Sequence, residues 1–205
     1  FRHLSFACAL HAFVGYGVGN FMPLFLGRIH NMPILDIGWY YGLTAGIGGL
    51  AGTFVGGWLS DRMASKTGDQ RWYIWIPLIS TIAAIPFALI TFLVMESGMA
   101  ATISWLIPVF CGGFYLAPCI AMTHGLVGLR MRAMGSAVLF FVLNFIGLGL
   151  GPWITGIVSD VLTPEFGDYA LRYAMSLTVL VNIWCAFHYY LCSKTIREDL
   201  SNAPE

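Results

Sequence analysis

Within the long apolar stretches of this chain, only a few side chains have the chemistry to contact a solute. A histidine side chain ordinarily titrates near neutral pH, so His11 is a candidate to relay a proton or to meet a phosphate. Tyr16 and Asn20 are four residues apart, which places them on one face of a helix, and Phe140 and Asn144 repeat that spacing. Each asparagine brings two donors and an acceptor to a setting without water, so each must find a partner in protein, solute or a wet cavity.

Tyr115 is a further candidate, on a predicted helix that contains a proline. It shares a face with Cys111, Pro118 and Met122, and the proline frees a backbone carbonyl and can kink the helix. The Tyr115 hydroxyl would then be available in a cavity. The predicted substrate-binding set is His11, Tyr16, Asn20, Tyr115, Phe140 and Asn144.

Structural roles would also account for these residues. A neutral His11 imidazole can bond to a neighbouring helix, and the asparagines can form interhelical hydrogen bonds. An aromatic side chain at helical spacing, such as Tyr115, commonly serves packing. The residues alone leave both interpretations open.

The composition indicates a membrane protein. The chain is 58% hydrophobic and 10% charged, whereas soluble domains are about a quarter charged. So few charges cannot cover a water-facing surface, which makes lipid the expected solvent. The net charge of zero argues against a nucleic-acid partner. The five cysteines lie in or beside apolar runs without C-x-x-C spacing, so no metal site and no cofactor is predicted.

Six apolar stretches are each about long enough to cross a bilayer as a helix. We therefore predict an all-α, polytopic membrane protein with one domain over residues 1–205. The predicted spans are 4–26, 37–59, 73–95, 103–127, 136–158 and 170–192, followed by a cytoplasmic tail over 193–205. Because the chain begins at Phe1, we expect it to be a piece of a longer protein.

The basic residues predict the orientation. With a cytoplasmic N-terminus, eight of them fall on the cytoplasmic side: Arg2, Arg62, Lys66, Arg71, Arg130, Arg132, Lys194 and Arg197. Only Arg28 and Arg172 fall on the other side. This bias follows the positive-inside rule and predicts a multi-pass protein of the cell (inner or plasma) membrane with both termini cytoplasmic.

Two stretches indicate an internal repeat. A Gly-x-x-Ser-Asp pattern ends at Asp61 and again at Asp160, near the ends of the second and fifth predicted spans. These ends would lie on opposite sides of the membrane, so the spans are expected to form two inverted three-helix repeats. Glycines at 48, 52 and 56, and at 147, 149 and 151, predict close or bendable helices.

The residues around the first repeat carry a family resemblance. Gly57, Asp61, Arg62 and Lys66 resemble the loop motif of the major facilitator superfamily, with departures at Ala64 and Ser65. The chain is similar to the second six-helix half of that fold. The resemblance implies alternating access against a missing N-terminal six-helix half. It also implies that Asp61 and the basic residues tie neighbouring helix ends together on the cytoplasmic side.

Four segments look like bacterial members of the spinster branch of that superfamily: Ala9–Gly17, Asn144–Pro152, Leu171–Ala174 and Arg197–Leu200. The branch implies proton-linked export of lysolipids and sphingoid phosphates. The predicted function is thus secondary active transport of a small organic or amphipathic, lysolipid-like solute, coupled to protons. Because no charged residue lies mid-span, the coupling carboxylate is expected in the missing half.

Other function classes remain open from the residues. An intramembrane enzyme such as a rhomboid-like protease needs a facing nucleophile and base, and its Gly-x-Ser-Gly turn is absent from the sequence, so no catalytic residue is predicted. A channel would need a pore-loop setting, which Gly15-Tyr16-Gly17 lacks. Transport of organic anions by another branch of the superfamily is the third possibility.

Overall fold

The computed structural model describes residues 1–203, and all regular structure within them is helical. This confirms the predicted all-α class. The longer helices are α1 (Arg2–Gly19), α2 (Met22–His30), α3 (Ile34–Thr67), α4 (Trp72–Leu93), α5 (Gly98–Gly112), α6 (Leu116–Gly125), α7 (Arg132–Leu143), α8 (Gly151–Phe166) and α9 (Ala170–Ser201). Short helices are η1 (Gly113–Tyr115), η2 (Leu129–Met131), η3 (Asn144–Leu150, a π-helix) and η4 (Gly167–Tyr169).

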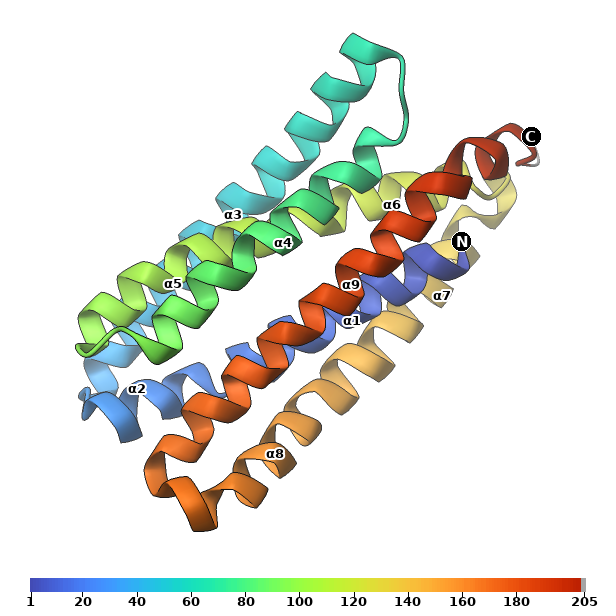
Figure 1. Cartoon of the computed structure of the whole chain (residues 1–205). Coiled ribbons are helices and arrows are strands. Elements are labelled where there is room, and N and C mark those ends of the chain that lie inside the picture. The colour runs from blue at the N-terminus through green and yellow to red at the C-terminus, as the bar shows by residue number, and fades with distance from the viewer. Residues whose placement is uncertain (204–205) are drawn as a thin grey trace.

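The helices run back and forth as one elongated bundle (Figure 1). Helix α9 packs along α1 and α4, while α3 packs against α5. The two ends of the chain lie at the same end of the bundle, where the Phe1 amino group is 4.0 Å from the Asp199 carboxylate (Figure 1). Helix α9 continues to Ser201, so the predicted tail is helical over 193–201, and residues 204–205 of that tail lie outside the described part.

Three predicted spans are interrupted, each at an identifiable position. The span 4–26 divides between α1 and α2, because Pro23 has no N–H to bond the Gly19 carbonyl. The Tyr41 hydroxyl donates to that carbonyl instead, at 2.9 Å. The span 103–127 changes to 3₁₀ geometry at Gly113, and the span 136–158 contains the π-helix at Asn144. The glycine- and proline-rich segments thus interrupt regular α-helix geometry.

Glycines bring the helices into backbone contact, which confirms the packing prediction for one face of α3. Gly48, Gly52 and Gly56 are buried, and a Cβ at Gly52 or Gly56 would collide with the backbone of Phe110 or Phe114. On the other side of the bundle, a Cβ at Gly147 would lie 2.6 Å from the Ala12 Cβ. Residues this small are what allow two helices to approach so closely.

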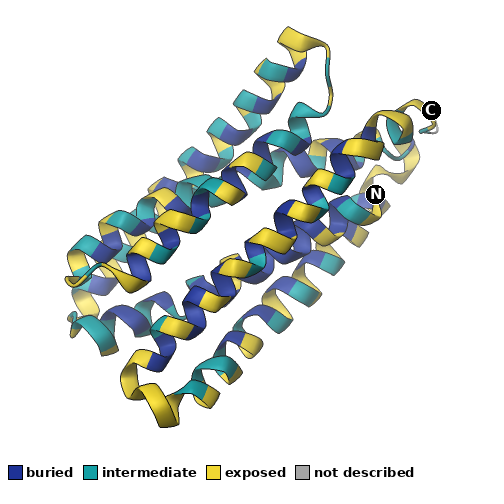
Figure 2. Ribbon diagram, viewed as in Figure 1, coloured by how far each residue is buried: buried dark blue, intermediate teal, exposed yellow. Residues whose placement is uncertain are grey.

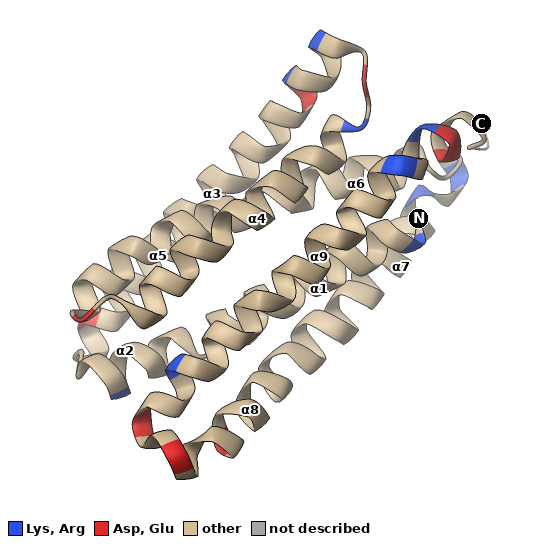
Figure 3. Cartoon of the chain, viewed as in Figure 1, with Lys and Arg blue, Asp and Glu red and all other residues tan. Residues whose placement is uncertain are grey.

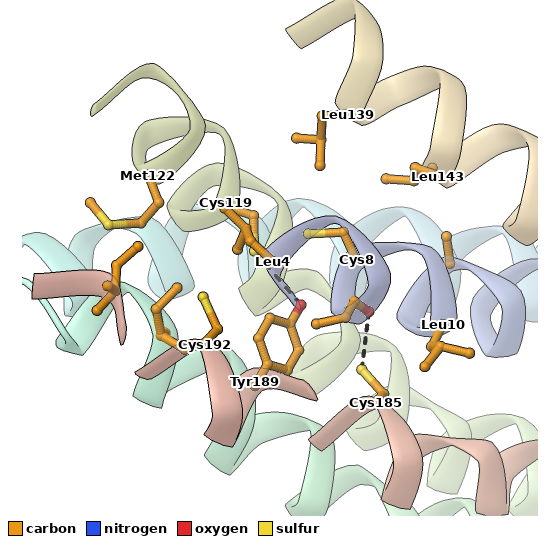
Figure 4. Close-up of a cluster of buried hydrophobic side chains, with 14 residues drawn as sticks. Leu4, Cys8, Leu10, Cys119, Met122, Leu139, Leu143, Cys185, Tyr189 and Cys192 are labelled. Atoms are coloured by element: carbon orange, nitrogen blue, oxygen red, sulfur yellow. Dashed lines mark hydrogen bonds between the residues drawn. The ribbon is translucent and has the colours of Figure 1, made fainter. Parts of the chain in front are cut away.

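The core is apolar and contains most of the cysteines. Cys8, Cys119, Cys185 and Cys192 are buried in a cluster around Tyr189 (Figure 4). The Cys185 thiol donates to the Ala7 carbonyl at 3.2 Å, so it joins α9 to α1. These cysteines act as small apolar side chains, as expected from the sequence.

The outer surface is also apolar along most of its length. Buried and exposed residues alternate along the helices, and many large apolar side chains are exposed, including Leu50, Phe54 and Phe141 (Figure 2). Charged residues gather at the two ends of the bundle (Figure 3). An apolar girdle between charged ends is the surface expected of a protein whose solvent is lipid.

Length and composition identify four helical stretches that could cross a membrane: Arg2–His30, Trp72–Leu93, Gly98–Gly125 and Leu129–Ser201. The last stretch has 73 residues and reverses direction around Gly167, whose φ is 57°. Helix α3 is 34 residues long, but its glycines and aromatic residues lower its mean hydropathy. The count of six passes remains a prediction.

The two copies of the Gly-x-x-Ser-Asp pattern lie on different helices and at different ends. Asp61 is in the part of α3 that leads to α4, and Asp160 is in the part of α8 that leads to η4. These two connections are at opposite ends of the bundle (Figure 1). This placement agrees with two inverted repeats.

Substitution of two glycines of α3 should separate packing from helix propensity. Gly52→Ala would force a methyl group into the Phe110 carbonyl, so it should destabilise the fold by about 1–3 kcal/mol. Gly49→Ala meets no atom within 4 Å and should be neutral or stabilise by up to about 1 kcal/mol. Thermal unfolding of the full-length protein in detergent measures both, and equal effects would contradict the packing interpretation.

Candidate functional site

A cavity of about 320 Å³ opens between α1, α3, α4, α5 and α9. Small residues leave this space because they carry little or no side chain; these are Ala12, Gly15, Gly19, Ala45, Ala84, Ala88 and Gly112. Larger side chains complete the lining: His11, Val14, Tyr16, Tyr41, Trp105, Pro108, Val109, Tyr115, Val179 and Asn182. The cavity walls are therefore mainly apolar and aromatic, with a few polar groups, which is the usual composition of a small-molecule site.

His11 is buried in the cavity wall and is held by two helices. A carbonyl can only accept a hydrogen bond, so Nε2 carries the proton that is donated to the Gly112 carbonyl at 3.0 Å. In the neutral ring Nδ1 then accepts from the Thr81 hydroxyl at 3.1 Å. Both ring nitrogens are thus engaged, and His11 joins α1 to α4 and to the end of α5.

Two of the predicted tyrosines lie in the same cavity as His11. The Tyr115 ring stacks on the imidazole, with the centroids 4.1 Å apart and the planes at 24°. Tyr16 lies one helical turn further along α1 and is 37% exposed, so it stands at the mouth. The structure therefore brings together three of the predicted residues: His11, Tyr16 and Tyr115.

The other three predicted residues are exposed and do not line this cavity. Asn20 follows the end of α1, whereas Phe140 is in α7 and Asn144 begins the π-helix. The Asn144 amide donates to the Phe140 carbonyl at 2.8 Å, which is a local bond rather than an interhelical one. Phe140 and Asn144 belong to α7 and η3, which pack against α1 but contribute no residue to the cavity lining.

The sequence interpretation missed three of the polar or aromatic residues of the cavity lining: Tyr41, Trp105 and Asn182. A signal existed for Asn182, which is an amide in the middle of an apolar run like the two asparagines that were selected. No comparable signal distinguished Tyr41 or Trp105 from other aromatic residues near helix ends. Only the folded chain shows that these two face the same space.

The loop motif lies away from the cavity, at the end of the bundle where the chain termini meet. Asp61 accepts a hydrogen bond from the Tyr73 hydroxyl of α4 at 2.7 Å, and Arg62 lies over the Trp58 ring at 5.4 Å. Gly57 faces α6, where a Cβ added to it would lie 3.4 Å from the Cβ of Ala117. Lys66 is exposed. Asp61 thus joins α3 to α4.

Ion pairs at this end are formed by a different aspartate, which sequence analysis did not select. Asp69 accepts from Arg71 at 2.8 Å and from Arg197 of α9 at 2.7 Å. The hydrogen bonds from Arg71, followed by those from Arg197, hold the pKa of the Asp69 carboxyl well below its usual value of 3.8. Arg197 thereby ties the loop between α3 and α4 to the end of α9.

Removal of the imidazole should show how much its two hydrogen bonds contribute. His11→Leu leaves the Gly112 carbonyl and the Thr81 hydroxyl without this partner, so we expect destabilisation by about 1–3 kcal/mol. His188→Leu is the matched control, since His188 is only half-buried and, among the described residues, hydrogen-bonds only to His3. Thermal unfolding of the full-length protein measures the difference, and an unaffected His11→Leu protein would contradict the assigned bonds.

The Asp69–Arg197 pair should be weak and dependent on pH. Arg197 is 60% exposed, so solvent screening limits the coupling in a double-mutant cycle of Asp69→Asn and Arg197→Gln to about 1 kcal/mol or less. Because the Asp69 pKa is lowered by folding, this stabilisation is present above pH 3.8 and is lost as the pH falls below it. Unfolding midpoints at neutral and acidic pH test this, with exposed Glu198→Gln as control; a coupling that grew on acidification would contradict it.

Comparison with known proteins assigns the chain to a family. The family described as the Major Facilitator Superfamily matches residues 2–205. An "MFS-type efflux pump" of Mycolicibacterium smegmatis is 35% identical over 187 residues, which are 91% of this chain and 43% of the pump.

Two solved structures show the same fold. Both are of a bacterial homolog to the human lysosomal transporter Spinster, in inward-facing unoccupied and occupied conformations. Each is 28% identical, with TM-scores of 0.87 and 0.83, and the match covers 97% of this chain but only 48% and 50% of the other. The chain spans about half the length of the relatives that it matches, and it belongs to the Major Facilitator Superfamily.

Proposed function

We propose that this chain forms one half of a secondary active transporter, which moves a small organic or amphipathic solute by alternating access. The family match and the half-length coverage support a transport role and a second half of similar size. The solute would lie between the two halves, in contact with the cavity described above. The relative that is an efflux pump supports outward movement.

The observation that carries this proposal is a set of exposed, uncharged polar side chains between the charged ends, one of which lines the cavity. Tyr16, Asn20 and Asn144 are exposed between charged ends, on a surface that is otherwise apolar. An amide directed into hydrocarbon is unfavourable, so such a face needs water, protein or solute against it. A second half across a wet, solute-sized space supplies all three.

The helix interruptions support movement of this half. The π-helix at Asn144–Leu150 and the change to 3₁₀ geometry at Gly113 lie on helices that contact α1 and α3. Isolated π-helical turns occur frequently at functional sites, and such turns let a helix bend. Bending at these points would change the cavity wall at Tyr115 together with the glycine contacts at Gly52 and Gly147, which lie at the interruptions.

The cavity lining favours an apolar or amphipathic solute. Trp105, Tyr115 and the valines offer apolar area, and the lining residues include no Asp, Glu, Lys or Arg. A phosphate or carboxylate normally binds Arg or Lys. We infer that a lysolipid-like solute would place its tail against this half and a charged headgroup against the other.

Proton coupling is assigned to the other half. Within the part of the chain that the structure describes, every Asp and Glu lies at or near the ends of the bundle (Figure 3). His11 has both ring nitrogens engaged by protein, so it serves better as a structural wall than as a proton carrier. His11, Tyr16 and Tyr115 would contact the solute, while Asn20, Phe140 and Asn144 would face the opposing half.

The end of the bundle with Asp61 is proposed to be cytoplasmic and to latch one state. Basic residues of α3, α9 and the loops gather there, together with both chain termini (Figures 1 and 3). This distribution follows the positive-inside rule and supports insertion in the cell membrane with both termini inside. Gly57, Asp61, Arg62 and Lys66 would meet helix ends of the other half in that state.

Reconstitution tests the function directly. The full-length protein in liposomes should move a fluorescent lysophospholipid when a pH gradient is imposed, whereas the 205-residue chain alone should not, because it supplies only one wall of the pathway. Release of the probe to external albumin gives the rate. Empty liposomes and a collapsed gradient are the controls, and transport by the 205-residue chain alone would overturn the proposal.

A further inference from the structure

We propose that Asn182 of α9 is a ligand-binding residue, whose amide bonds an uncharged hydroxyl group carried by the solute. This inference rests on the proposed function only for the identity of the ligand as a transported solute. The binding itself depends on the cavity and on the chemistry of one buried side chain.

The side-chain amide of Asn182, in the cavity wall, lacks a hydrogen-bond partner for its oxygen within the described part of the chain. Asn182 is 6% exposed and lines the cavity, and its Oδ1 atom has no hydrogen-bond partner among residues 1–203. Buried polar side-chain atoms are nearly always hydrogen-bonded, because an unpaired one loses its water contacts without compensation. Because the Asn182 side chain lines the cavity, a group that enters this space can supply the partner that its amide lacks.

The neighbouring residues do not meet this need. Val179 precedes Asn182 by about one turn of α9, and α4 contributes Ala84 and Ala88 to the same lining, so these neighbours have no side-chain polar group. The polar His11 side chain of the same lining already bonds Thr81 and Gly112 through its nitrogens. Among residues 1–203, none supplies a hydrogen bond to the Asn182 oxygen.

A solute satisfies these conditions better than water. A buried water requires about two to four polar partners, and the walls formed by Val179, Ala84 and Ala88 are apolar. An amphipathic molecule needs only the amide for its polar group and covers the apolar walls with its own carbon atoms. One ligand would then bind both the apolar walls of the cavity and the unpaired amide.

The chemistry of the site narrows the class of ligand. No charged side chain occurs among the lining residues, so an ionised group would be desolvated without a counter-charge. A hydroxyl both donates and accepts, so it satisfies the Asn182 amide in either orientation of the side chain. The ligand is therefore an uncharged alcohol at the Asn182 end, with an apolar or aromatic body that extends along Trp105 toward Tyr16.

Photolabelling of the full-length protein in lipid vesicles tests this assignment. The probe is a long-chain alcohol that carries a diazirine and a terminal alkyne, and its partner probe has a methyl group in place of the hydroxyl. Cross-linked peptides are then mapped by mass spectrometry. The alcohol should label residues of the cavity lining, and Asn182→Leu should lower that labelling about threefold to tenfold, as for the loss of one hydrogen bond.

Two controls isolate the hydroxyl contact. The methyl-terminated probe should label wild type and Asn182→Leu equally, so differences in membrane partition cancel. Ser193→Ala removes another buried hydroxyl from α9 that bonds the Tyr190 carbonyl at 2.8 Å, outside the cavity, and should leave labelling unchanged. Labelling of the wild-type protein by the two probes can also be compared directly, and this comparison does not depend on whether a variant folds.

The outcomes are distinct from those of the transport assay. Labelling that ignores the hydroxyl, or that avoids the cavity peptides, overturns the inference and leaves Asn182 hydrated by water alone. The labelling needs no gradient and no second solute. If the alcohol probe labels preferentially but the protein transports no solute, the binding site is supported and the transport role is rejected. If the protein transports solute but labelling shows no preference for the hydroxyl, the transport role is supported and the binding site is rejected.

Discussion

The structure depends on one constraint: in hydrocarbon, every backbone carbonyl must find a donor within the protein. Regular helices meet this condition by themselves, but the interrupted ones do not. At the break after α1 the Tyr41 hydroxyl bonds the Gly19 carbonyl, and at the end of α5 the His11 imidazole bonds the Gly112 carbonyl. Both of these side chains line the cavity, so the groups that bond the free carbonyls at the helix breaks are also part of the site.

Glycine contacts explain how a bundle with such breaks stays ordered. Helix α3 meets α5 backbone to backbone at Gly52 and Gly56, and α1 meets α8 where a Cβ on Gly151 would lie 2.5 Å from the Phe13 carbonyl. The cavity opens between these two contacts, bounded by α4 and α9. Close packing at the small residues thus holds the helices together on either side of the space that forms the cavity.

The distribution of charge separates two kinds of chemistry. The cavity has polar but uncharged groups, of which His11 is satisfied by protein and Asn182 is not. The charged groups lie at the ends, where Asp69 and Arg197 connect a loop to α9. In the proposed transporter, recognition on this side of the pathway thus comes from shape and single hydrogen bonds, while electrostatic latching is confined to the bundle ends.

The sequence by itself determined the all-α membrane class, the glycine faces and the family, because hydropathy, small-residue spacing and the loop motif are local properties. It also selected His11, Tyr16 and Tyr115, which the folded chain brings to one cavity, with Tyr115 stacked on His11. Only the tertiary structure decided that Asn20 and Asn144 lie outside the cavity and that Tyr41, Trp105 and Asn182 lie within it. The reason is that a helical face is set by spacing, whereas the neighbour it meets is set by packing between distant helices.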